Sequence, residues 1–170
     1  MLSGLLLLYV GAVLCLNGLW MADFIHEREI VPINLATGTI ALAVAGYMVF
    51  GPGANDETVA AAAMTLLFSI TYFWVAWNRM TGGDGRGLGW FSLFVAITVL
   101  PVAWSRIAAA EDGFALWLGL NWVAWSALWA TYFVALTLRL AIRRTAAAAT
   151  LAAGVLTGWI PGVMILNNMV

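Results

Sequence analysis

Three tryptophan residues recur at steps of three and four in one long apolar stretch of the sequence. Trp122, Trp125 and Trp129 would share one face of a helix, which Leu118 extends toward the membrane surface. Trp125 and Trp129 would lie about 12 to 18 Å along the helix axis from Trp117, close to the middle of a bilayer. Tryptophans that anchor a helix lie at the membrane surface instead. Deep indole rings can stack on a flat solute or pack helices together, and the spacing permits both roles.

Two other stretches place aromatic and polar side chains on a single helix face. Phe68 and Tyr72 are one helical turn apart, with Thr71 beside them, and Tyr72 would also lie deep. A buried tyrosine hydroxyl or indole N–H needs a partner, since an unsatisfied group in hydrocarbon costs a few kcal/mol. Near the N terminus, steps of four and three bring onto one face Ser3, Leu7, Val10, Leu14 and Asn17. This face is apolar in its middle and polar at both ends, as the wall of a narrow pore would be.

No charged side chain is predicted inside the membrane. The eight acidic residues all fall in predicted loops: Asp23, Glu27, Glu29, Asp56, Glu57, Asp84, Glu111 and Asp112. A charge at the centre of a membrane helix costs about 2.5 to 3.5 kcal/mol on insertion scales, and proton relays, carboxylate filters and voltage sensors retain such charges for their work. The sequence therefore excludes these devices and favours an uncharged cargo, although an inert lipid-facing bundle would also lack interior charge.

The residue types needed for enzymatic chemistry are scarce. His26 is the only histidine and lies in a predicted loop, and Cys15 is the only cysteine, so neither a zinc site nor a disulfide framework is predicted. The glycine-rich run 83–87 fits neither a Walker loop nor a dinucleotide fingerprint, and we interpret it as a flexible turn. All seven basic residues are arginines and form no basic stripe, which argues against nucleic acid as a partner. We expect no catalytic residues, no cofactor and no metal.

The composition is that of an integral membrane protein. Of 170 residues, 64% are hydrophobic and 9% are charged, and the mean hydropathy is +0.98. Six apolar stretches, each about 20 residues long, match the roughly 30 Å thickness of the bilayer core when helical. They cover approximately residues 2–22, 31–50, 58–78, 87–106, 115–138 and 146–167. We therefore expect one all-α domain over residues 1–170, a bundle of six transmembrane helices.

The arginines predict the orientation of the bundle. Positive residues near helix ends stay on the cytoplasmic side. Only Arg106 lies in an even-numbered connection, and the other six lie in or beside the odd-numbered ones: Arg28, Arg79, Arg86, Arg139, Arg143 and Arg144. Both termini are thus expected outside the cytoplasm.

Two weaker patterns concern the symmetry and the breaks of the helices. Residues 8–11 resemble residues 93–96, which fits an inverted repeat of three helices plus three, although apolar helices often match by chance. Pro101 and Pro161 each free the carbonyl four residues back, at Ile97 and Thr157. These carbonyls would line a cavity or merely accompany kinks.

An ordered set of short motifs resembles the AmiS/UreI family of urea channels and amide transporters over nearly the whole chain. The motifs are Leu7–Gly11 with Asn17-Gly18, Thr71-Tyr72 with Asn78, Trp90–Ile97 with Pro101, Trp122 with Trp125 and Leu128-Trp129, and Leu156-Thr157 with Trp159–Pro161. The resemblance implies a homohexamer in the bacterial inner membrane, with a pore in each protomer and lipid filling the centre. It also implies pore constrictions at Leu7, Val10, Leu14, Phe68, Tyr72, Trp122, Trp125, Leu128 and Trp129.

The residues and the resemblance together predict a passive channel for urea, acetamide and other short aliphatic amides, selected by an aromatic and aliphatic constriction. The alternatives are a non-transporting membrane scaffold or sensory subunit, and an ion-coupled amide transporter. The chain departs from the acid-gated members of the family in its short outer loops, which lack histidine, and in Ala153, which aligns with a glutamate there. The amide-transporter branch is the nearer match, and urea stays open as a solute.

Overall fold

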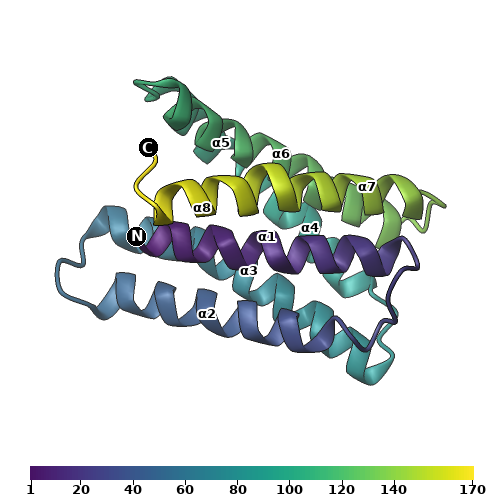
Figure 1. Cartoon of the computed structure of the whole chain (residues 1–170). Helices are drawn as coiled ribbons and strands as arrows, with labels where there is room; N and C mark the ends of the chain where they lie inside the picture. Colours follow the sequence, from purple (N-terminus) through teal and green to yellow (C-terminus); the bar gives the residue numbers. More distant parts are fainter.

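The computed structural model describes every residue from Met1 to Val170 and is built of helices alone. In chain order these are α1 (Leu2–Met21), α2 (Val31–Phe50), α3 (Asp56–Thr81), α4 (Arg86–Thr98), α5 (Leu100–Ala108), α6 (Gly113–Leu136), α7 (Arg143–Ala153), the π-helical turn η1 (Gly154–Trp159) and α8 (Ile160–Leu166). Figure 1 shows the long helices running roughly along one axis. The predicted all-α class is confirmed.

The six predicted spans agree with the observed helices to within three residues at each end. Two spans are interrupted, because α4 passes into α5 at Val99 and α7 passes into α8 through η1. Each break precedes a proline, Pro101 or Pro161, which lacks the N–H that a continuous helix needs. Five spans are long and apolar enough to cross a membrane. Helix α6 has the length and no charge, but its four tryptophans and Asn121 lower its hydropathy.

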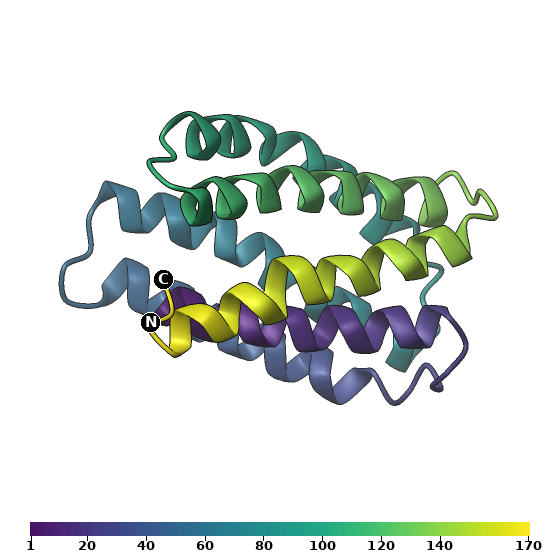
Figure 2. The same cartoon turned by 45° about the horizontal axis from the view of Figure 1, so that its top comes forward.

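The spans pack into a closed ring, in which neighbours in the chain touch and the last span returns to the first. The most extensive contacts join α2 to α3, α4 and α5 to α6, and α1 to α7, η1 and α8. Both termini lie at the same end of the bundle (Figure 1 and Figure 2). A half-chain repeat would make α6 pack on α7 and α8 as closely as α2 packs on α3. It does not, so the inverted repeat is not confirmed.

Two acidic residues depart from the predicted loop positions. Asp56 and Glu57 form the first turn of α3, which begins two residues earlier than expected. The Asn55 side chain accepts hydrogen bonds from the backbone N–H groups of Glu57 and Thr58, and the positive end of the helix dipole favours carboxylates there. Because both residues stay at the helix end, the bundle interior remains free of charge.

Helix α1 and the last span approach so closely that their backbones touch. A Cβ atom on Gly158 would lie 2.5 Å from the Gly11 Cα atom, and one on Gly162 would lie 2.6 Å from the Leu8 nitrogen. Small residues allow such contact between membrane helices, where van der Waals packing provides much of the attraction. This contact fixes the last span, including η1, against the centre of α1.

We expect Gly158→Ala to destabilise the protein by about 1 to 3 kcal/mol, the usual effect of overpacking a tight contact. The thermal unfolding midpoint of the purified protein in detergent measures this effect. Gly46→Ala is the matched control, because a Cβ atom there has no neighbour within 4 Å. Equal midpoints for the two variants would contradict the close approach.

Candidate functional site

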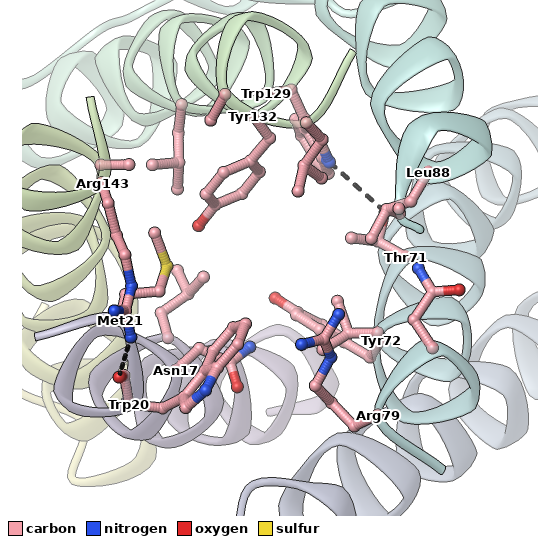
Figure 3. Close-up of a pocket in the computed structure, with 18 of the residues that line it drawn as sticks. Asn17, Trp20, Met21, Thr71, Tyr72, Arg79, Leu88, Trp129, Tyr132 and Arg143 are labelled. Carbon is pink, nitrogen blue, oxygen red and sulfur yellow. Dashed lines mark hydrogen bonds between the residues drawn. The ribbon is translucent and has the colours of Figure 1, made fainter. Parts of the chain in front are cut away.

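A cavity of about 290 Å³ opens at the end of the bundle opposite the termini. It lies between α1, α3, α6 and the starts of α4 and α7, and Figure 3 looks into it. Its wall is mostly apolar, and its lining includes Leu14, Asn17, Trp20, Phe68, Thr71, Tyr72, Trp125, Leu128, Trp129 and Tyr132. The only charged lining residues are Arg79 and Arg143, which come from the arginine-bearing ends of α3 and α7.

A layer of aromatic rings borders the deep side of this cavity. The Phe68 ring stands edge-on to three tryptophans, with centroid distances of 4.9 Å to Trp125, 4.8 Å to Trp129 and 6.2 Å to Trp122. Phe68, Trp125 and Trp129 are each at most 9% exposed. Edge-on contacts of this kind are favourable beyond the area they bury. We call Phe68, Trp122, Trp125 and Trp129 the aromatic layer.

The predicted site residues divide into three groups by position. Those that line the cavity are Leu14, Asn17, Phe68, Thr71, Tyr72, Trp125, Leu128 and Trp129. A second group lies outside the cavity lining but belongs to, or packs against, the buried hydrophobic cluster around Phe68, Trp125 and Trp129. This group is Leu7, Val10 and Trp122. Leu118 belongs to neither group, since it lies one full turn before Trp122 on α6, farther from the cavity. The structure therefore brings eleven of the twelve predicted residues to one region of the bundle.

Two of the three indole N–H groups of the aromatic layer, those of Trp125 and Trp129, bond to threonines on neighbouring spans. Trp129 Nε1 donates to Thr71 Oγ1 at 3.3 Å, and Trp125 Nε1 donates to Thr157 Oγ1 at 2.8 Å. Each threonine in turn donates to a carbonyl of its own helix. The prediction that deep polar groups need partners is confirmed for these two indoles but not for Tyr72, whose hydroxyl makes no hydrogen bond within the chain. A solute in the cavity therefore meets the faces and edges of the Trp125 and Trp129 rings, because their N–H groups are already used.

Neither Ile97 nor Thr157, whose carbonyls the two prolines free, is among the residues that line the cavity. Asn121 Nδ2 donates to the Thr157 carbonyl at 3.3 Å. At the other break the bonded carbonyl is that of Ala96, which accepts from Ser126 Oγ at 2.7 Å, and not the predicted Ile97. Of the two alternatives that the sequence leaves open for these carbonyls, simple kinks agree with this lining.

Three polar residues near the cavity were not among the predicted site residues, although Asn78 was noted as part of a motif. Asn34 on α2 exchanges two hydrogen bonds with Asn17, at 3.2 and 2.7 Å. Tyr132 lines the cavity and bonds to Thr150 Oγ1 at 2.8 Å. Asn78, which also lines the cavity, has a buried amide nitrogen without a partner. A signal for Tyr132 existed, because it follows Trp129 by three residues and so continues the tryptophan stripe.

Ion pairs hold the mouth of the cavity. Arg143 contacts both Asp23 carboxylate oxygens, at 2.6 and 3.0 Å, and the Trp20 carbonyl at 3.2 Å. Arg79 pairs with Glu27 at 3.0 Å and lies 5.0 Å from the centre of the Trp20 ring. Trp20 is thereby fixed between the two guanidinium groups at the rim.

A further pair lies in the neighbouring α3–α4 connection. Hydrogen bonds from Arg86 hold the pKa of the exposed Asp84 carboxyl below its ordinary value, with the Arg139 charge adding to the effect. This carboxylate therefore stays ionised well into the acid range. No three His, Cys, Asp or Glu side chains gather as a set that could hold a metal ion.

The sequence has relatives among membrane transporters. The family model for AmiS/UreI family transporters matches residues 2–169. A protein of Mycolicibacterium smegmatis named as a candidate amidate substrates transporter is 35% identical over 168 residues, which cover 98% of this chain and 78% of the relative. The acid-activated urea channel of Helicobacter pylori is 30% identical over 185 aligned residues, covering 93% of this chain and 94% of the relative.

The fold agrees with solved structures of that channel. The crystal structure of the Helicobacter pylori urea channel superimposes with a TM-score of 0.86 at 30% identity, covering 99% of both chains. The cryo-electron microscopy structure of the same channel in a closed state gives a TM-score of 0.85 at 28% identity, covering 98% of both chains. The match of family model, sequence and fold over nearly the full length shows that this chain belongs to the AmiS/UreI family of transporters.

Proposed function

We propose that this protein is a passive membrane channel for small uncharged amides such as urea and acetamide. The observation that carries the proposal is a cavity that ends on a buried aromatic layer with no charged group beyond its mouth. The names of the relatives, a urea channel and a candidate transporter of amidate substrates, support the same class of solute. No covalent chemistry is part of the mechanism.

The aromatic layer would select against ions. An ion that enters a dry passage needs ligands to replace its hydration shell, and the Trp125 and Trp129 rings, whose N–H groups are already bonded, supply none. A planar amide needs far less, because it carries no net charge and its flat faces can stack on the rings. In this mechanism the solute enters through the wide mouth beside Arg79 and Arg143 and crosses the layer between Phe68 and the tryptophans of α6.

The assembly and orientation belong to the same proposal. We count α6 as the sixth crossing, since it has the length of the others and carries no charged residue. The arginine-rich end would face the cytoplasm and both termini would lie outside, in the bacterial inner membrane. By resemblance to the family, six protomers would form a ring around a central plug of lipid, each with its own pore.

Two other functions make different predictions. A non-transporting scaffold or sensory subunit would use the aromatic layer for packing alone and would carry no flux. An ion-coupled amide transporter would need a titratable or ion-binding group in its path, and the charged lining residues lie at the mouth only. Neither alternative has an observation that favours it over the channel.

Proteoliposomes containing the protein are expected to take up urea and acetamide down their gradients faster than protein-free liposomes. The rates should be the same with and without a proton-conducting uncoupler, because no proton-coupling group lies in the passage. Stopped-flow light scattering measures both. Accumulation against a gradient that an uncoupler abolishes would point to the ion-coupled transporter, and an absence of flux would point to the scaffold.

Phe68→Ala is expected to relax size selection, because Phe68 contacts all three tryptophans of the layer. The ratio of butyramide to acetamide permeability should rise several-fold. The substitution should also destabilise the protein by about 3 to 5 kcal/mol, so the ratio is measured on the folded fraction. Phe50→Ala is the control, since Phe50 is 88% exposed at the end of α2. An unchanged ratio would place the selective constriction elsewhere.

External acid is expected to leave urea flux unchanged between about pH 7 and pH 5, in contrast to the acid-activated relative. The only histidine, His26, lies in the α1–α2 connection at the arginine-rich end. The acidic side chains at the opposite end are Asp56, Glu57, Glu111 and Asp112, and no histidine, whose charge ordinarily changes in this pH range, lies there. Flux measured over a series of external pH values tests this, and a steep rise on acidification would contradict it.

A further inference from the structure

We propose that Tyr72 and Tyr132 form a two-ended hydrogen-bonding site for primary amides, in which Tyr72 donates to the solute carbonyl and Tyr132 accepts from the solute N–H. The inference rests on the proposed function and adds a residue that recognises the nitrogen end of the solute. Both side chains line the cavity on the mouth side of the aromatic layer, Tyr72 from α3 and Tyr132 from α6. Figure 3 shows both hydroxyls directed into the space between the helices.

The polarity of Tyr132 follows from a count of protons. Thr150 Oγ1 has one proton and donates it to the Ala146 carbonyl at 2.7 Å. Its other approach, 3.9 Å to the Met21 sulfur, is to a much weaker acceptor. The 2.8 Å hydrogen bond between Tyr132 Oη and Thr150 Oγ1 therefore takes its proton from Tyr132. The Tyr132 oxygen is left with lone pairs only and acts toward the cavity as an acceptor.

Tyr72 has the opposite polarity. Tyr72 is only 3% exposed, and its hydroxyl makes no hydrogen bond within the chain. The hydroxyl oxygen still has accessible surface, because it is not among the fully enclosed polar atoms that lack a partner. Its proton is free to meet a solute in the cavity. The indole N–H groups of Trp125 and Trp129 cannot take its place, because both are bonded to threonines. Asn17 is held by its two bonds to Asn34.

The cavity therefore offers one free hydroxyl donor and one oxygen restricted to accepting, next to the layer that the solute has to cross. A primary amide or urea carries the matching pair, a carbonyl acceptor and N–H donors. A tertiary amide can satisfy Tyr72 but leaves the Tyr132 oxygen unpaired. The site would thus favour solutes with N–H groups over solutes of the same size without them.

Three isomeric amides test this directly. Propionamide, N-methylacetamide and N,N-dimethylformamide share one formula and one carbonyl but carry two, one and no N–H groups. Stopped-flow permeability through the full-length protein in liposomes, corrected for protein-free liposomes, should fall in that order. Tyr132→Phe should lower propionamide permeability about fivefold and leave N,N-dimethylformamide unchanged. Tyr72→Phe should lower all three isomers by a similar factor, because all three have the carbonyl.

Two more variants complete the design. Thr150→Val removes the acceptor of the Tyr132 proton and frees that proton for a solute carbonyl. The permeability of N,N-dimethylformamide should therefore rise relative to that of propionamide. Tyr47→Phe is the matched control and should change nothing, since Tyr47 is 55% exposed on the outer face of α2. Ratios between isomers in one vesicle preparation do not depend on how much of a variant has folded.

The outcomes separate the two proposals. If Tyr132→Phe leaves all three permeabilities unchanged or reduces them equally, Tyr132 does not recognise the N–H group, and the amide channel stands without this site. If the unmodified protein adds no flux of urea or of any isomer, the proposed function fails and the site fails with it.

Discussion

A polar group inside a bilayer has to find its partner within the protein, and this constraint organises the bundle. Helix α6 shows it most fully, because its polar side chains bond to three different spans. Trp117 and Asn121 donate to carbonyls of the last span, and Trp125 donates to a hydroxyl there. Ser126 bonds to α4 and Trp129 to α3. The helix with the most polar and aromatic sequence is thereby the one that ties the others together.

The same bonds decide what the cavity offers to a solute. The indole N–H groups of Trp125 and Trp129 already bond to threonines and are not available to a solute. The hydroxyl protons of those threonines are not available either, because each bonds to a backbone carbonyl. What remains at the deep end is apolar ring surface and a small number of hydroxyls. Such a surface offers an ion few ligands, but it offers a flat neutral solute ring faces on which to stack. Selectivity therefore depends on which donors are already hydrogen-bonded within the protein as well as on which groups face the cavity.

The sequence predicted where the helices lie and which side chains share one helix face, but it did not predict which side chains bond to each other. Hydropathy placed the helices to within a few residues, and helical periodicity placed Trp125 with Trp129 and Phe68 with Tyr72, because both depend on local spacing. The bonds from Asn17 to Asn34 and from Trp125 to Thr157 join residues far apart in the chain, and spacing carries no information about them. Leu118 lies outside the cavity lining because a helix face is longer than the part of it that meets the cavity.

The positions of the helix breaks bear on how a solute could cross a closed layer. Near each break a backbone carbonyl, that of Ala96 or Thr157, accepts a hydrogen bond from α6, through Ser126 or Asn121. If α6 moved away as a body, it would leave two carbonyls without partners at membrane depth, each costing several kcal/mol. Rotation of a ring costs far less, since edge-on contacts are worth about 0.5 to 1.5 kcal/mol each beyond their buried area. Passage through the layer is therefore expected to proceed by side-chain rotation of Phe68 and the tryptophans, within a backbone that α6 holds in place.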